Sequence, residues 1–135
     1  MKILKILLVL IFCIFCLNGC SDEEAGIFFN NEPINENNIL HSKRNFNAGK
    51  RIYYLFYSPE KIKSEFIRIQ VFKADDKVAV GGYKIIFTQD KRVMKQNMYY
   101  YDGNIVLHSA GKYVMQIFDV MDITKPLAWN FFYVE

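Results

Sequence analysis

The order of apolar and polar residues divides the chain into three zones. Residues 6–17 are almost entirely apolar, and residues 21–47 are polar with scattered apolar positions. From Lys50 onward, apolar and aromatic residues come in short runs that turn-forming residues separate at regular intervals. This texture is typical of a β-sandwich or barrel. Only residues 59–63 fit a helical turn, so the last zone predicts a fold of about seven or eight strands.

The individual strands follow from alternation and from turn dipeptides. Residues 51–57 are apolar on both faces and predict a central strand. In 65–73, Ile67, Ile69 and Val71 point one way and polar residues the other, which predicts a half-buried strand. Further strands are expected over 78–80, 83–88, 98–101, 105–108, 112–120 and 129–134, with hairpin turns at Gly81-Gly82 and Asp102-Gly103 and a polar loop over 89–96.

The apolar run at the N-terminus has the layout of a secretory signal. It follows the basic residues Lys2 and Lys5, and its dozen or so residues are fewer than the ~20 that a helix needs to span a bilayer. It ends in Leu17-Asn18-Gly19-Cys20, which resembles the lipobox of bacterial lipoproteins, although Asn18 is larger and more polar than that pattern requires. The alternatives are a buried apolar helix and an uncleaved membrane anchor.

The lipobox resemblance implies a processing step and a location. Signal peptidase II would remove residues 1–19 and leave a diacylglyceryl-modified Cys20 at the start of the mature chain. Each buried methylene contributes about 0.8 kcal/mol, so two or three acyl chains hold a protein firmly on a membrane that it does not cross. Ser21 favours the outer membrane in bacteria with two membranes. The implied location is otherwise the outer face of the plasma membrane.

Cysteine and charge counts narrow the chemistry of the mature chain. Cys13 and Cys16 would leave with the signal and Cys20 would carry lipid, so neither a disulfide nor a thiol ligand is expected. Without the two signal lysines, 15 basic residues face 14 acidic ones, which gives no overall bias toward nucleic acid. With only His41 and His108 as further candidates, we predict no metal, no cofactor and no catalytic residue.

Residues 20–47 are interpreted as the lipidated cysteine and a polar tether, and residues 48–135 as one domain. Asparagine and glutamate dominate the tether, and such a composition buries too little apolar surface to offset the entropy of ordering. Residues 27–29 and 39–40 are the exceptions, and one of them is a candidate for an edge strand.

A second resemblance concerns architecture. Ala110-Gly111-Lys112-Tyr113 leads into an alternating strand, which is similar to the penultimate strand of immunoglobulin-like sandwiches. There the tyrosine hydroxyl bonds back to nearby backbone as a tyrosine corner. Met115 stands where antibody domains place a cysteine, and residues 131–135 resemble the last strand of bacterial Ig-like modules. The resemblance implies an all-β fold, a single Ig-like antiparallel β-sandwich; the alternative is a hairpin in another β-fold.

Clustered aromatic residues are the candidates for binding. Tyr99, Tyr100 and Tyr101 stand beside the expected Asp102-Gly103 turn. Neighbouring strand residues point to opposite faces, so at least one of these rings must point away from the core. Exposed tyrosine suits an interface because it offers apolar area and a polar tip. The alternative is that both faces are covered, or that tyrosine serves as a good strand former.

These features favour a non-catalytic interaction module, anchored in the cell envelope by the lipid on Cys20, that contacts a protein or a polysaccharide. The alternative is an accessory or assembly subunit of an envelope complex. A carboxylate-dependent hydrolase is a third hypothesis. Its candidate carboxylates, Asp75, Asp76, Asp119 and Asp122, stand at expected turns, where aspartate commonly bonds local backbone.

Overall fold

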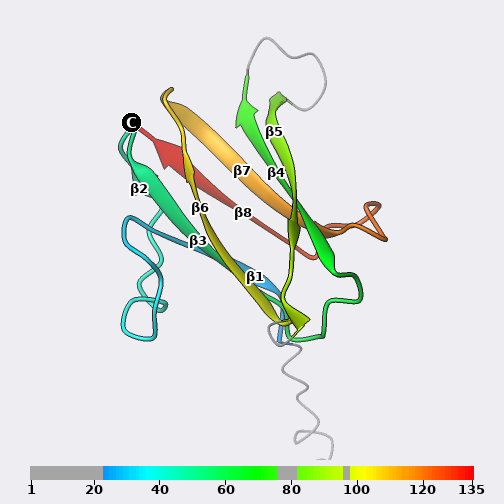
Figure 1. Ribbon diagram of the computed structural model, residues 1–135. Coiled ribbons are helices and arrows are strands. Elements are labelled where there is room, and N and C mark those ends of the chain that lie inside the picture. Colours follow the sequence, from blue (N-terminus) through cyan, green and yellow to red (C-terminus); the bar gives the residue numbers. More distant parts are fainter. Residues whose placement is uncertain (1–22, 76–81, 96–97) are drawn as a thin grey trace, which may run out of the picture.

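The computed structural model describes residues 23–75, 82–95 and 98–135, which form an all-β fold of two sheets (Figure 1). These residues contain no α-helix, and none of their segments is a helix long and apolar enough to cross a membrane. Their strands are β1 (Gly26–Asn30), β2 (Asn45–Phe46), β3 (Arg51–Tyr57), β4 (Phe66–Ala74), β5 (Tyr83–Arg92), β6 (Tyr100–Val106), β7 (Gly111–Asp119) and β8 (Ala128–Val134).

The strands pair into a three-stranded sheet, ordered β1-β3-β6, and a five-stranded sheet, ordered β2-β8-β7-β4-β5. The short β2 runs parallel to β8, and the other paired strands are antiparallel. Along β3, and along β4 as far as Val71, every second side chain is buried, as expected where two sheets stack face to face and enclose a core. The sheets therefore have inner faces that form this core and outer faces that point away from it.

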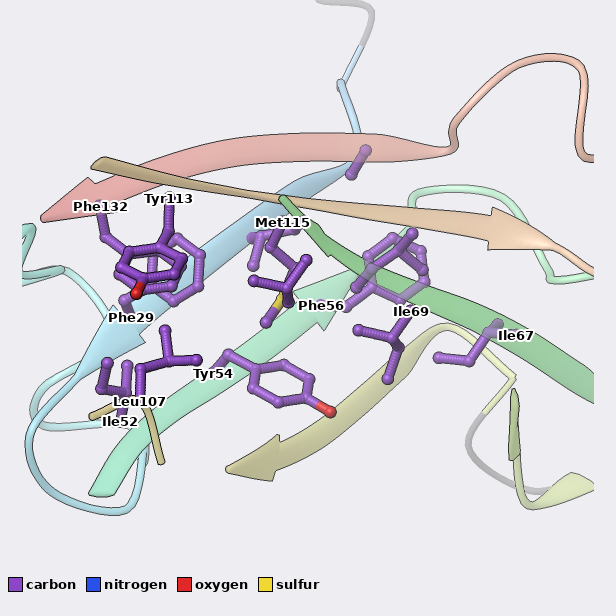
Figure 2. Close-up of a cluster of buried hydrophobic side chains, with 14 of the residues drawn as sticks. Phe29, Ile52, Tyr54, Phe56, Ile67, Ile69, Leu107, Tyr113, Met115 and Phe132 are labelled. Atoms are coloured by element: carbon purple, nitrogen blue, oxygen red, sulfur yellow. The ribbon is translucent and has the colours of Figure 1, made fainter. Parts of the chain in front are cut away.

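Aromatic rings join the two sheets at one end of the core (Figure 2). Phe132 of β8 lies with its ring centroid 4.7 Å from Phe29 of β1, 5.9 Å from Phe46 and 5.7 Å from Tyr113. All four rings are buried. Because Phe29 and Phe132 come from different sheets, their contact holds the sheets together.

The folded domain begins before the boundary expected at residue 48. β1 pairs with β3 along its whole length, and its residues Ile27 and Phe29 belong to the core. The edge of β1 that faces away from β3 is also hydrogen-bonded. The Phe29 nitrogen donates to Ser42 Oγ at 3.0 Å, and the Lys43 nitrogen donates to the Phe29 oxygen at 2.8 Å. Residues 27–29 thus supply the edge strand, and the interpretation of 20–47 as a tether is corrected from Gly26 onward.

Asparagine side chains order the polar segment between β1 and β2. The Asn35 nitrogen donates to Asn38 Oδ1 at 2.8 Å, and the Asn37 nitrogen donates to Asn35 Oδ1 at 2.9 Å. Asparagine favours such turns because its short amide bonds nearby backbone. Composition alone suggested disorder here, whereas local amide bonds and the pairing of the flanking strands hold the segment in place.

Several predicted strands match the structure closely. β3 has the expected bounds, β4 and β7 differ from the expected strands by one residue at each end, and β8 begins one residue earlier than expected. β5 continues to Arg92, where a loop over 89–96 was expected, because its residues pair with β4 as far as Phe66. The strand expected over 78–80 and Gly81 of the expected turn lie outside the described residues.

Asp102-Gly103 does not form the expected hairpin turn. β6 runs without a break from Tyr100 to Val106, so the strands expected over 98–101 and 105–108 are one strand. Gly103 lies opposite Tyr54 of β3, and a Cβ at Gly103 would lie 2.5 Å from the Tyr54 hydroxyl oxygen. Glycine inside a strand often marks such a close approach. Here it makes room for the Tyr54 ring rather than for a turn.

Tyr113 makes the contact expected of a tyrosine corner. Its hydroxyl donates to the Ser109 carbonyl oxygen at 2.7 Å and lies 2.8 Å from Ser109 Oγ. The ring is buried against Phe132, so the hydroxyl is the polar tip of a core residue. The sequence prediction of this local contact is confirmed.

Candidate functional site

The structure separates the three tyrosines proposed from sequence. Tyr101 points inward and packs against Tyr54 with 6.3 Å between ring centroids, and burial raises the pKa of Tyr101. Tyr100 is exposed on the outer face of the three-stranded sheet, opposite Tyr57 of β3. Tyr99 is exposed in the turn before β6. The three rings therefore do not form one binding patch at a hairpin tip.

Tyr100 borders an apolar hollow that the segment between β1 and β2 helps to form. The hollow has a volume of about 510 Å³ and lies over the outer face of the three-stranded sheet. It is lined by Phe28, Ile34, Asn35, Glu36, Ile39, Leu55, Tyr57 and Tyr100. The ordered segment over 31–44 thus covers part of this face and leaves less of it free for a partner.

The outer face of the five-stranded sheet carries a second apolar hollow, which we call the aromatic groove. Its volume is about 470 Å³, within the range of ligand sites in proteins. It is lined by Phe72, Tyr83, Val114, Gln116, Pro126 and Trp129. These residues come from four neighbouring elements, β4, β5, β7 and β8, and from the loop before β8.

Strand alternation explains why these side chains point outward. In β8, Ala128 and Phe132 are buried, so Trp129 faces the opposite side. Gln116 of β7 is the cross-strand neighbour of Trp129, and Val114 is the neighbour of Phe72. A bulge in the pairing of β4 with β5 falls between Val71 and Phe72, and bulges commonly re-aim side chains next to functional sites.

Trp129 is the main exposed feature of the aromatic groove. It is the single tryptophan of the chain, and 61 % of its surface is exposed. A large apolar side chain in water is unfavourable unless something covers it. Trp129 is not among the binding residues expected from sequence, although strand alternation over the expected strand 129–134 would place its side chain opposite that of Phe132.

Charged residues flank the aromatic groove along the sheet. The guanidinium of Arg44 lies 4.1 Å from the centre of the Phe131 ring, and the Lys112 ammonium lies 5.0 Å from it. Between β4 and β5, Arg68 and Asp90 form a two-bond ion pair at 2.8 and 2.9 Å. That pair holds the pKa of the Asp90 carboxyl below its usual value. The outer face thus offers an apolar centre with charged and polar groups around it.

The carboxylates considered from sequence bond their own surroundings. Asp119 is buried, and its carboxylate accepts from the Ser64 nitrogen at 3.3 Å and from the Met121 nitrogen at 2.9 Å. Asp122 accepts from the backbone and the hydroxyl of Thr124, and these bonds lower the pKa of Asp122. Asp76 lies outside the described residues. In the part of the chain that the structure describes, no three His, Cys, Asp or Glu residues are grouped to hold a metal ion.

Comparisons with known proteins do not assign this chain to a family. No family model matches it, and no curated protein matches it. Among solved structures, it is similar to the alkylpurine DNA glycosylase AlkC of Pseudomonas fluorescens bound to DNA containing an abasic site analog, with 11 % identity and a TM-score of 0.41 over 83 % of this chain and 30 % of that one. A β-glucosidase of Kluyveromyces marxianus in complex with glucose gives 14 % identity and a TM-score of 0.39 over 83 % of this chain and 14 % of that one. The chain spans less than a third of either protein, and TM-scores this low assign it no function.

Proposed function

We propose that this chain is a non-catalytic binding module, held in the bacterial cell envelope by lipid on Cys20. Residues 1–22 lie outside the described part of the chain, so the anchor rests on the resemblance of Leu17-Asn18-Gly19-Cys20 to a lipobox. With Ser21 after the cysteine, we place the protein at the outer membrane where the cell has one, and otherwise on the outer face of the plasma membrane.

We assign the fold to the Ig-like sandwiches. The order β1-β3-β6 corresponds to strands A, B and E of such a sandwich, and β8-β7-β4 corresponds to G, F and C, with β5 in the place of C′. The tyrosine corner of Tyr113 is at the start of β7, the strand that corresponds to F. The aromatic groove then lies on the outer face of the sheet that contains G, F and C.

The exposure of Trp129 in the aromatic groove carries the proposal that the module binds a partner. An aromatic side chain presents about 150–250 Å² of surface, and 61 % of Trp129 is uncovered. At about 25 cal/mol per Å², the transfer free energy for covering the exposed part is about 3 kcal/mol, from which the entropic cost of association is subtracted. Tryptophan in a pocket is also the residue type that most often dominates binding energy at interfaces. Trp129 therefore replaces Tyr99–Tyr101 as the proposed centre of contact with a protein or polysaccharide.

Photo-crosslinking in living cells tests this proposal. A benzophenone amino acid in place of Gln116 sits in the aromatic groove beside Trp129, and the same amino acid in place of Asn104 sits on the outer face of the other sheet as a control. We expect a discrete adduct from position 116 that Trp129→Ala abolishes. Its mass distinguishes a protein from a glycan, because benzophenone reacts with C–H bonds of both. Equal adducts from both positions, or none from position 116, would contradict the proposal.

A further inference from the structure

One end of the sandwich gathers the start of the described chain and three loops. The loops follow β3 (58–65), β5 (93–95 and 98–99) and β7 (120–127), and Figure 1 shows them at the end where β1 begins. We call this set of residues, together with 23–26 and the adjoining strand ends, the basal end.

Backbone hydrogen bonds tie the loops of the basal end to one another. The Ser58 nitrogen donates to the Tyr99 oxygen at 2.7 Å, and the Ile62 nitrogen donates to the Met98 oxygen at 2.8 Å. The Val93 nitrogen donates to the backbone oxygen of Glu65 at 2.8 Å. The Val120 nitrogen of the loop after β7 donates to the Phe66 oxygen at 3.3 Å, next to the loop after β3. The basal end is thus one connected surface rather than three independent loops.

Large apolar side chains protrude from this surface. Met121 is 82 % exposed, Met94 is 64 % exposed and Ile123 is 54 % exposed. Phe66, Tyr57, Tyr99 and Tyr100 are also exposed at this end. Scattered exposed apolar residues are common on protein surfaces, but a cluster on one end indicates a site that something apolar covers.

The beginning of the chain identifies what lies next to the basal end. Glu23 accepts a hydrogen bond from the Tyr57 hydroxyl at 3.3 Å, which places residue 23 at this end. Cys20 is three residues earlier, and three residues of extended chain span at most about 11 Å. A lipid on Cys20 would therefore hold residue 23, at the basal end, within about 11 Å of the acylated residue at the membrane surface.

We propose that the basal end docks in the membrane interface, an inference that rests on the proposed lipid anchor. Met121, Ile123 and Met94 lie at the boundary of the acyl chains. Tyr99 and Tyr100 lie at the level of the headgroups, where amphipathic aromatic rings are favoured. This role explains why Tyr99 and Tyr100 are exposed and requires no protein partner at that position.

The charges of the basal end indicate which force drives docking. Its exposed charged residues are Lys61, Lys63, Arg92, Lys95 and Lys125 against Glu23, Glu24, Glu60, Glu65 and Asp122. This balance gives no net attraction to anionic lipid. Insertion of apolar side chains therefore dominates, and docking is expected on zwitterionic lipid and at high as well as low salt.

Spin labels on the full lipidated chain in phosphatidylcholine vesicles test docking. The mature chain offers no other free thiol once Cys20 is acylated, so a cysteine introduced by Met121→Cys takes a single label. Ala110→Cys places a control label in the exposed turn between β6 and β7, at the opposite end (Figure 1). We expect the Met121 label to be several-fold more accessible to oxygen than to a water-soluble nickel complex, and the Ala110 label to show the reverse.

Paired substitutions at the protruding residues provide the matched test. Met121→Asp with Ile123→Asp should raise the nickel accessibility of a label at Met94→Cys several-fold. Ile85→Asp with Ile86→Asp, an exposed apolar pair on β5, should leave it unchanged.

The outcomes separate docking from anchoring. If the N-terminus carries lipid and the Met121 label is as accessible to nickel as the Ala110 label, docking is wrong and the anchor stands. If mass spectrometry shows no lipid on Cys20, the anchor is wrong, and docking fails with it because nothing then holds the basal end at the membrane.

Discussion

Replacing Gly103 with alanine tests whether this glycine serves a close packing contact or a turn. The new Cβ would lie 2.5 Å from the hydroxyl oxygen of Tyr54 and 2.7 Å from the ring carbon that bears it. Tyr54 is 3 % exposed, so its ring has little room to move away. Overpacking of this kind costs about 1–3 kcal/mol, and the lower entropy of the unfolded alanine chain offsets about 0.4–1 kcal/mol of that cost. We expect Gly103→Ala to lower the free energy of unfolding by about 1–2 kcal/mol.

A double-mutant cycle with Tyr54→Leu separates the two explanations. Leucine lacks the three Tyr54 atoms that a Cβ at Gly103 would meet, so Gly103→Ala should be neutral or slightly stabilising in that background. Urea unfolding of the unlipidated chain that starts at Ser21 measures all four free energies. A turn at Asp102-Gly103 would need the glycine whatever stands at Tyr54. An equal loss in both backgrounds would therefore refute the packing explanation.

Three further predictions concern the core, the pH dependence and the anchor. Tyr113→Phe should lower the free energy of unfolding by about 1 kcal/mol, because it removes the hydroxyl that bonds Ser109 and leaves the ring in place. Urea unfolding curves of the variant and the parent that overlay would contradict the tyrosine corner. Burial raises the pKa of Tyr54 and Tyr101 above the ordinary value of 10.0, so the folded state disfavours the phenolates. Their contribution to stability is complete below about pH 10 and is lost as the pH rises further, which urea unfolding at successive alkaline pH values measures. Mass spectrometry of the native N-terminus should find a chain that starts at acylated Cys20, and a chain that starts at Met1 or is cut elsewhere without lipid would rule the anchor out.

Local patterns predicted those elements whose cause is itself local. The apolar run of 51–57 and the alternation around Ile69 reflect burial on the inner face of a sheet, so β3 and β4 lie close to their expected bounds. The Tyr113 contact spans four residues and was predicted from a short motif. Asp102-Gly103 failed as a turn signal because its conformation depends on Tyr54, far away in sequence.

Non-local pairing also explains why sequence composition did not indicate that residues before 48 belong to the domain. Phe29 and Phe46 are buried because they meet Phe132, about ninety to a hundred residues later in the chain. Their polar neighbours dominate the local composition and conceal this contribution to the core. Strand alternation alone could have placed Trp129 on an outer face. Its position in an apolar groove, however, depends on the neighbours that β4, β5 and β7 place around it.

Because β1 belongs to the sandwich, the lipid proposed on Cys20 would be joined to the domain by only a short linker. A flexible tether of 28 residues would let the domain move about 30 Å from that lipid, whereas the stretch from Cys20 to Glu23 spans at most about 11 Å. Under this proposal the aromatic groove would explore a thin layer along the membrane instead of a deep volume above it. Confinement to such a layer raises the effective concentration of the groove toward partners that are themselves membrane-bound. A partner that stands far from the membrane would have to extend a segment down to this module.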